Sequence, residues 1–270
     1  MRMISWLRVL RGTALAAFVL TAGSATADPQ AIRFYEDAVS RFNSGDARGA
    51  MVQLQNTLRL DPTQLPARVL MARVQLSLGN PSQAEEELLH AEKLGADPAL
   101  IAVPLARARN LLGKHQAVID ELYPNAYPPS VRADLWVELA KARLGVKDRR
   151  GAEAALATAF RLVPAHEEGL ITQARELVNE RKFAEAEPLI NDILGRYPEN
   201  VDAWFLMGTA QHARGQLDGA LAHYRQALAL DPGHVKAAVG EALTLVDGGR
   251  LADAAVRLAE VAKRRPYSVE

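Results

Sequence analysis

The 270-residue sequence contains no cysteine, which excludes disulfide bonds, thiol nucleophiles and a lipidated cysteine as a membrane tether. Aromatic residues make up only 6% of the chain, so a core has to be built mainly from Ala and Leu, which are strong helix formers. The formal net charge is +0, so the overall charge gives no indication of a nucleic-acid partner. The composition therefore predicts a helical protein with an aliphatic core.

The first 27 residues have the pattern of a secretory signal. Three arginines precede an apolar stretch from Ala14 to Leu20, and Ala25 and Ala27 form the A-x-A motif that signal peptidase cleaves. The apolar stretch is shorter than the ~20 residues that span a bilayer. We expect cleavage after Ala27 and export to the periplasm as a soluble chain without a transmembrane segment. The alternative is an uncleaved N-terminal anchor.

Internal repeats of 34 residues run through nearly all of the remaining sequence. After a short lead-in at 28–30, seven rows follow without insertion or deletion, and residues 269–270 begin a truncated eighth row. The rows are 31–64, 65–98, 99–132, 133–166, 167–200, 201–234 and 235–268. The eighth position of every row is small: Ala38, Ala72, Ala106, Ala140, Ala174, Gly208 and Ala242.

Each recurring position has a steric reason. Small residues at positions eight and twenty, such as Ala140 and Ala152 in row four, let two antiparallel helices approach to ~8 Å, whereas Glu138 is expected on the polar side. Glycine at position fifteen permits the left-handed backbone that ends a helix, but Lys147 and Arg181 stand there in rows four and five. Proline at position thirty-two stops the second helix. Each row thus predicts a helix, a tight turn, a helix and a break.

This pattern resembles the tetratricopeptide repeat, and row 201–234 matches it best. The family positions are filled there by Trp204, Gly208, Gly215, Ala220, Tyr224, Ala227 and Pro232. The resemblance implies an all-α fold, a right-handed solenoid of seven helix-turn-helix repeats. It also implies a protein that binds other macromolecules.

A narrower resemblance lies in the first three rows, in the segments GDARGAMVQLQNTLRLDP, LGNPSQAEEELLHAEKLGADP and LLGKHQAVIDEL. They are similar to the PrsT-like exported repeat proteins of bacterial exopolysaccharide systems associated with exosortase sorting. This likeness implies an envelope scaffold that assists assembly or export of a polysaccharide or an envelope complex. The alternative is a soluble chaperone-like or carbohydrate-binding factor that escorts an acidic polymer or peptide.

No residue pattern in the sequence indicates an enzyme. The six histidines never form H-E-x-x-H or another close metal-ligand spacing, and Gly113-Lys114 lacks the rest of a phosphate-binding loop. No G-x-S-x-G motif is present. We therefore expect no catalytic residues, no cofactor and no metal.

The family resemblance places one face of each first helix on the concave surface, which is the candidate binding groove. Position five is apolar in every row, and its candidate ligand contacts are Val69, Val103, Val137, Ile171 and Phe205.

Position nine carries a basic ladder, defined as Arg73, Arg107, Lys141 and Arg175. The first helices of rows two and three contain no acid, and acids collect instead on the second helix of row two. We expect the ladder to bind an acidic extended peptide or polysaccharide. The alternatives are that position five packs against the next row and that the basic side chains only solvate their helices.

Two regions depart from the repeat. Row three contains Tyr123 and Tyr127 in the segment 123–129, which cannot be helical through three prolines, and Pro104 is expected to disturb its first helix. This predicts a bend or hinge with two tyrosines available for contacts; the alternative is a tolerated surface irregularity. The last row is followed by no polar capping helix, so it is expected to expose apolar surface to a partner, a second copy or further sequence.

Overall fold

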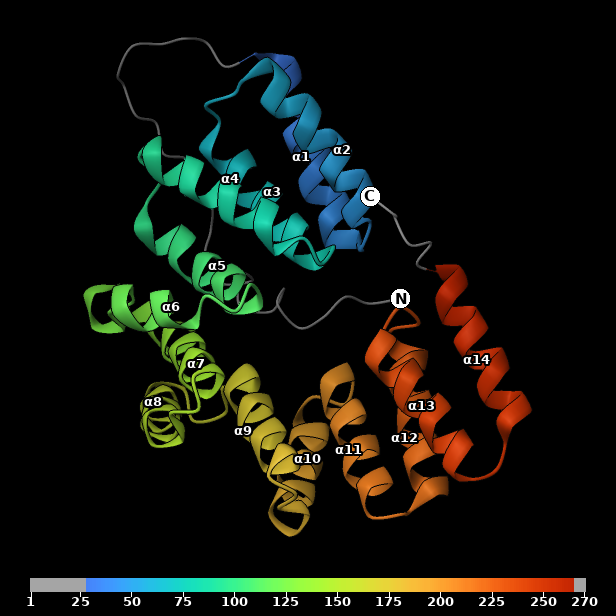
Figure 1. The fold of residues 1–270 in the computed structure, drawn as a ribbon. Coiled ribbons are helices and arrows are strands. Elements are labelled where there is room, and N and C mark those ends of the chain that lie inside the picture. The colour runs from blue at the N-terminus through green and yellow to red at the C-terminus, as the bar shows by residue number, and fades with distance from the viewer. Residues whose placement is uncertain (1–27, 265–270) are drawn as a thin grey trace. The chain divides into compact units, whose positions relative to one another are not determined.

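The computed structural model describes residues 28–264, and it is all-α (Figure 1). Within this range the chain forms fourteen α-helices and one short 3-10 turn, without a strand. The predicted all-α repeat fold is confirmed. The expected signal segment 1–27 and the start of an eighth row at 269–270 lie outside the described residues. The helices form two compact units, whose described parts are residues 28–166 and 167–264.

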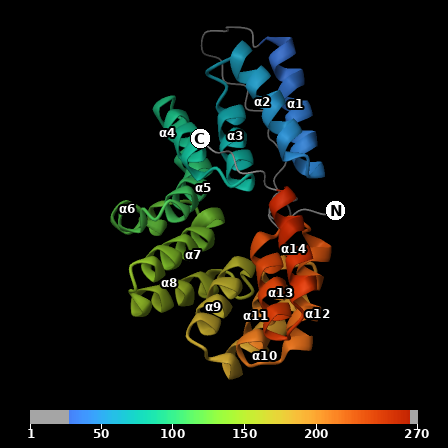
Figure 2. The same ribbon diagram turned by 45° about the vertical axis from the view of Figure 1, so that its right-hand side comes forward.

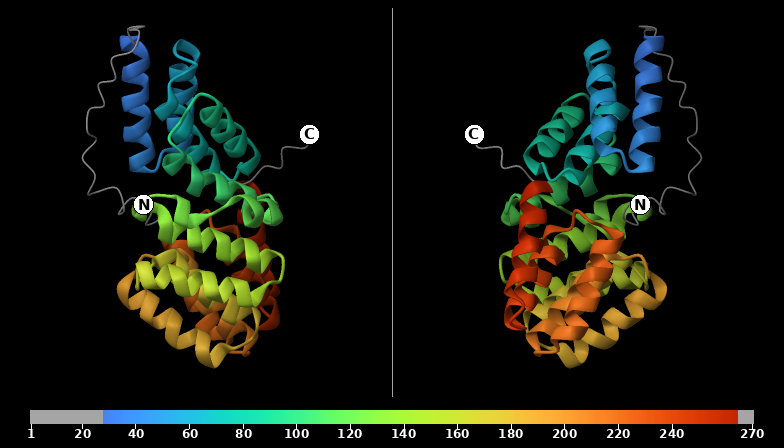
Figure 3. Two further views of the ribbon diagram at one scale, coloured as in Figure 1. Left: turned by 90° about the vertical axis from the view of Figure 1, so that its left-hand side faces the viewer. Right: turned by 90° about the vertical axis from the view of Figure 1, so that its right-hand side faces the viewer.

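The first unit contains α1 to α8, arranged as helix pairs. Its elements are α1 (Pro29–Ser44), α2 (Ala47–Leu60), α3 (Leu65–Ser77), α4 (Pro81–Lys93), α5 (Pro98–Leu111), α6 (His115–Glu121), η2 (Pro124–Ala126), α7 (Pro129–Gly145) and α8 (Arg149–Leu162). Figure 3 shows α1 in dark blue beside α2 in lighter blue. The first helices of successive pairs also contact one another, α1 with α3, α3 with α5 and α5 with α7. They therefore form one layer of this unit.

The second unit repeats this arrangement with α9 to α14. Its elements are α9 (Glu167–Asn179), α10 (Phe183–Arg196), α11 (Val201–Ala213), α12 (Leu217–Leu230), α13 (Val235–Asp247) and α14 (Leu251–Arg264). Figure 2 shows α11 to α14 as neighbouring helices. The first helices again contact one another, α9 with α11 and α11 with α13.

The turns between paired helices share one backbone conformation. Gly215 ends α11 in the left-handed region with φ 74°, and the glycines at position fifteen of the other glycine rows also have positive φ. Lys147 and Arg181 adopt the same conformation, with φ 65° and φ 59°. The turn therefore has the same backbone conformation in the rows that lack the glycine. There it is strained, because in the left-handed region the Cβ atom lies too close to the following carbonyl oxygen.

Small and aliphatic residues fill the inside of each hairpin. The position-eight residues are buried, and Ala140, Ala152 and Leu156 pack in one cluster inside the α7/α8 hairpin. In the last hairpin, by contrast, Leu243 and Leu251 are 54% and 65% exposed. The expectation that this hairpin exposes apolar side chains is confirmed, whereas self-association through it stays a prediction.

Row three is irregular only in its second helix. α6 has seven residues where the other second helices have thirteen or fourteen, and the chain leaves it at Leu122, just before Pro124. The predicted break is confirmed. The expected disturbance at Pro104 is wrong, because α5 runs through it. Proline removes only the hydrogen bond to the carbonyl of Leu100, a residue that is 61% exposed, so water can solvate that carbonyl.

Candidate ligand-binding face

The apolar position-five residues differ in what they offer to a ligand. Val69, Val103 and Phe205 are half-buried, whereas Val137 and Ile171 are each 1% exposed. Burial at this level means that Val137 and Ile171 stabilise the packing within their own units. The candidate contacts that keep accessible surface are therefore Val69 and Val103 in the first unit and Phe205 in the second.

Arg73 lies on α3 beside Tyr35 of α1. The guanidinium is half-buried, and desolvation lowers its pKa from the usual range, while the charge of Tyr35 acts in the opposite direction. Burial raises the pKa of the Tyr35 hydroxyl, and the positive charge of Arg73 opposes this shift. No carboxylate within residues 28–264 forms an ion pair with Arg73. The site thus holds a partly desolvated positive charge that nothing described in the chain compensates.

The next two members of the basic ladder converge on one buried carboxylate. Nε of Arg107 and Nζ of Lys141 each donate to Oε1 of Glu138 at 3.0 Å. Nδ2 of Asn110 donates to Oε2 of Glu138 at 3.0 Å and to its backbone carbonyl at 2.9 Å. The Glu138 side chain is 1% exposed. Arg107 and Lys141 therefore neutralise a carboxylate between α5 and α7.

One expectation about charge is wrong as a consequence. Glu138 does not lie on the polar side of its helix, because position six of row four, which lies on α7, faces α5 inside the layer of first helices. Two other arginines of rows two and three pair with acids of the second helices: Nη1 of Arg68 lies 2.7 Å from Oε2 of Glu87, and Nη1 of Arg109 lies 2.6 Å from Oε2 of Glu121. Each second helix packs on its first helix, so its acidic side chains reach these arginines.

Arg175, the fourth member of the ladder, lies in the second unit. Its Nη2 lies 3.2 Å from Oδ1 of Asp202, and Nε2 of His234 lies 3.9 Å from the same oxygen. Burial acts to raise the pKa of Asp202, but the nearby His234 imidazole and the charge of Arg175 act to lower it, and the pKa is lowered overall. Arg175 is thus held by a carboxylate of the adjacent first helix.

Asn110 and Glu138, which contact each other beside the ladder, were not among the candidate site residues predicted from the sequence. A signal for Glu138 was present at position six, where Leu70 and Leu206 stand in other rows and are 8% and 2% exposed. A charged residue at a position that is buried in other rows needs a buried counter-charge. Arg107 at position nine of the preceding row is that counter-charge.

The described residues give no indication of a metal centre or a membrane span. Among residues 28–264, no group of three or more histidine or acidic side chains could hold a metal ion. No helix in the same range is both long and apolar enough to cross a bilayer.

Two family models, both described as tetratricopeptide repeat, match the chain. One matches residues 171–235, and the other matches residues 41–103 and 211–267. Together the matched segments cover more than half of the chain. No curated protein sequence matches it.

Several solved structures are similar to the chain at low sequence identity. A tetratricopeptide repeat protein from Parabacteroides merdae is 12% identical, with a TM-score of 0.60 over 90% of this chain and 95% of that chain. PilF from Pseudomonas aeruginosa is 19% identical, with a TM-score of 0.48 over 77% of this chain and 95% of that chain. MamA from Desulfovibrio magneticus is 13% identical, with a TM-score of 0.39 over 90% of this chain and 99% of that chain. The first likeness shows the fold alone.

Proposed function

Because the chain belongs to the tetratricopeptide-repeat family, whose members generally mediate protein–protein interaction, we propose that it is a non-catalytic scaffold. Its ligand is an extended polypeptide segment that carries an acidic side chain. The segment binds to the layer of first helices in residues 28–166, at the surface formed by Tyr35, Val69, Arg73 and Val103. We call this surface the Arg73 face.

The state of Arg73 is the observation that carries this proposal. A guanidinium that loses part of its hydration without gaining a carboxylate is less stable than an exposed one. A carboxylate of a ligand would form charge-assisted hydrogen bonds with it, and the guanidinium fork suits bidentate contact. The apolar surfaces of Tyr35 and Val69 would bury the neighbouring part of the segment. Arg107 and Lys141 contribute less, because they already contact Glu138.

We place this scaffold in the bacterial cell envelope, where it assists assembly or export of a polysaccharide or another envelope complex. The support is the sequence alone: the signal-like pattern of residues 1–27 and the likeness of rows one to three to exported repeat proteins. An N-terminus at Asp28 in protein recovered from the periplasm is the expected result of mass spectrometry. A full-length chain in the cytoplasm would remove the envelope proposal and leave the binding proposal intact.

The binding proposal is tested by pull-down from an envelope extract with the wild type and Arg73→Glu. Arg59→Glu, a reversal at an exposed residue of α2, is the matched control. Arg107→Glu is unsuitable, because it would place two carboxylates together in the buried cluster around Glu138 and change the stability of the fold. Recovery of the partner should fall about tenfold or more with Arg73→Glu and remain unchanged with Arg59→Glu.

Two results would contradict the Arg73 face. The first is equal recovery by Arg73→Glu and the wild type at equal melting temperature. The second is recovery that does not fall between low and high salt, since charge contacts at an accessible face are screened within ~10 Å at 0.1 M ionic strength. A recovered acidic polysaccharide without protein would support an escort factor instead of a protein scaffold.

A further inference from the structure

A small cavity lies between the last two hairpins of the second unit, where α12, α13 and α14 are neighbours (Figure 2). It is about 210 Å³ in volume. Its lining comes from α12, from α14 and from the turn before α13: Arg225, Leu228, Ala229, Pro232 and Arg257. Sites for whole small molecules usually measure about 300–1,000 Å³. A cavity of this size therefore suits a single side chain of a partner.

The two arginines of this cavity contact one buried carboxylate of α13. Nε of Arg225 donates to Oε1 of Glu241 at 2.8 Å, and Nε of Arg257 lies 2.6 Å from Oε2 of the same side chain. The Glu241 side chain is 2% exposed. The contact with Arg257 is an ion pair without hydrogen-bond geometry, because Oε2 has no hydrogen-bond partner within residues 28–264. Glu241 thus holds the two guanidinium groups close to each other.

One buried carboxylate cannot neutralise two guanidinium groups. Glu260 also contacts Nη1 of Arg257 at 2.8 Å, but its side chain is 49% exposed, and an ion pair in such contact with water is worth little. Neither Nη atom of Arg225 donates a hydrogen bond within the described part of the chain, and this side chain is 50% exposed. The two ladder members that contact Glu138 are only 14% and 20% exposed. Arg225 therefore keeps two donors that a ligand can reach.

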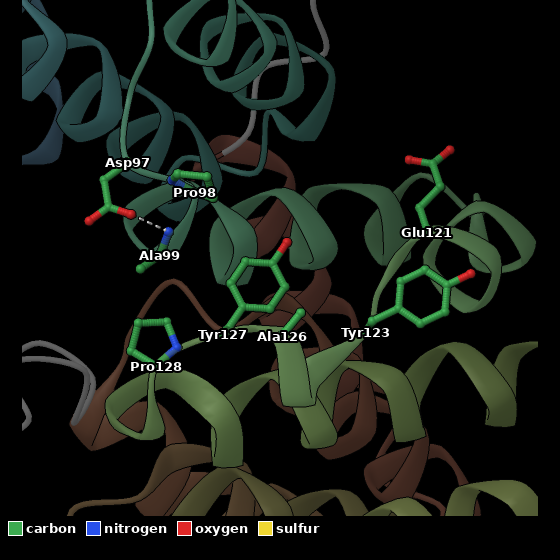
Figure 4. Close-up of a pocket in the computed structure, with 8 residues that line it drawn as sticks. All are labelled: Asp97, Pro98, Ala99, Glu121, Tyr123, Ala126, Tyr127 and Pro128. Carbon is green, nitrogen blue, oxygen red and sulfur yellow. Dashed lines mark hydrogen bonds between the residues drawn. The ribbon is translucent and has the colours of Figure 1, made fainter.

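The larger cavity of the first unit does not bring charged groups together in this way. It is about 380 Å³ in volume and lies where the shortened α6 is followed by η2. The Asp97 carboxylate and the Tyr123 ring lie at opposite ends of it, with Tyr127 between them (Figure 4). Its polar groups thus do not meet at one point, whereas the two arginines on Glu241 do.

We propose that the cavity between α12 and α14 binds a carboxylate side chain of a protein partner. The two Nη atoms of Arg225 would donate to its two oxygens, because the planar guanidinium presents them as a parallel pair. Arg257 would add its positive charge, and Leu228 and Pro232 would contact the apolar stem of the side chain. A carboxylate matches the one positive charge that Glu241 leaves, whereas a phosphate group carries about two negative charges.

This site goes beyond the Arg73 face, because it lies in the second unit and shares no residue with it. The test is a nuclear magnetic resonance titration of the purified protein, following the Nε–H resonances of Arg225 and Arg257. The probe is a six-residue peptide of glycine and serine with a central leucine–glutamate pair and both ends blocked, so that its single carboxylate is the glutamate side chain. The same peptide with glutamine is the control ligand. The glutamate peptide should shift both resonances, and the glutamine peptide should bind about tenfold more weakly.

Two variants locate the effect. Arg225→Lys keeps a positive charge beside Glu241 but lacks the paired donors, so it should weaken the glutamate peptide about fivefold or more at an unchanged melting temperature. Ala229→Glu, at an exposed residue one helical turn from Arg225, supplies a carboxylate from the chain itself and should weaken the peptide about tenfold or more. Arg196→Lys, at an exposed arginine of α10 that pairs with Asp192, should change nothing.

The proposal is overturned if the glutamine peptide binds as tightly as the glutamate peptide, or if Arg225→Lys or Ala229→Glu leaves the affinity unchanged. Tighter binding of inorganic phosphate than of the glutamate peptide would identify a phosphate site and overturn it as well. Arg73→Glu should not reduce binding of the glutamate peptide. Loss of peptide binding in Arg73→Glu would assign the peptide to the Arg73 face and remove this cavity from consideration, whereas failure of the Arg73 face alone leaves the site standing.

Discussion

The fourth and sixth hairpins, α7/α8 and α11/α12, have the same sequence spacing and fill it with different side chains. Position six is Glu138 in the fourth hairpin and Leu206 in the sixth, and they are 1% and 2% exposed. The packing of adjacent first helices buries this position in both hairpins, although one residue is charged and the other is apolar. The difference shows that a charge is tolerated at a buried repeat position when the neighbouring helix supplies its donors, as Arg107 and Asn110 do.

The inside of the two hairpins also differs. Ala140 faces Leu156 in the fourth, whereas Gly208 faces Tyr224 in the sixth. A Cβ at position 208 would lie 2.8 Å from Cδ1 of Tyr224, and one at Gly240 would lie 2.6 Å from its Cζ. The larger ring thus occupies the space that two missing methyl groups leave. In each hairpin the two helices therefore pack closely because a large side chain on one helix lies against a small residue on the other.

Removing the charge of Glu138 should have the largest effect. Glu138→Gln keeps the shape of the side chain but leaves Arg107 and Lys141 close together without their carboxylate. Breaking a buried ion pair from one side costs about 3–5 kcal/mol, so the free energy of unfolding measured in urea should fall by that order. Leu206 in the sixth hairpin needs no such compensation.

The matched control for this change is Glu153→Gln on the exposed side of α8, which should leave stability within ~0.5 kcal/mol of the wild type. If Glu138→Gln and Glu153→Gln unfold at the same urea concentration, the contacts around Glu138 contribute nothing to stability. The difference between Glu138 and Leu206 at position six would then not affect the free energy of unfolding.

Overpacking the fourth hairpin should have the next largest effect. Ala140 is 0% exposed, and Ala140→Leu adds three carbon atoms to a space already filled by Ala152 and Leu156. Such changes cost about 1–3 kcal/mol. A lower melting temperature by calorimetry is the expected result, and an unchanged one would mean that Ala140 does not form the close contact.

The sixth hairpin allows a smaller but more selective test. Gly208→Ala should destabilise by roughly 1 kcal/mol, because the clash with Tyr224 outweighs the better helix propensity of alanine. In a Tyr224→Leu background, which restores the pairing found in the fourth hairpin, the same change should become neutral or stabilising. A double-mutant cycle measures this coupling directly, and additive effects would show that Gly208 and Tyr224 do not fit one another.

The sequence was sufficient to predict the helix pairs, the break in row three and the small residues inside each hairpin, because these depend on local spacing, but not that α5 continues through Pro104. The basic ladder was harder to predict. Position nine of a first helix is accessible or neutralised according to the carboxylates of its own and neighbouring helices, as Arg73, which has none within residues 28–264, and Arg107, which pairs with Glu138, illustrate. That pairing crosses between helices 31 residues apart. The cavity beside Tyr123 could not be predicted either, because it depends on how the loop after α6 folds back.

The turns give the last and smallest contrast between the two hairpins. Lys147 holds the left-handed conformation with φ 65°, where the sixth hairpin has Gly215 with φ 74°. Lys147 is exposed, and no side-chain hydrogen bond or ion pair is formed by it among residues 28–264. A residue with a Cβ loses about 1–2 kcal/mol in this region, and the greater freedom of glycine in the unfolded chain offsets part of the gain.

Lys147→Gly should therefore stabilise the protein by roughly 0.5–1 kcal/mol, measured as a higher urea midpoint with an unchanged slope. The reverse change, Gly215→Ala, should destabilise by a similar amount through the backbone alone, because a Cβ there meets no atom within 4 Å. Arg181→Gly is less informative, since the Arg181 guanidinium also lies over the ring of Phe183 at 5.6 Å. If Lys147→Gly lowers the midpoint instead, the lysine side chain contributes more to the fourth hairpin than the strain of its backbone costs.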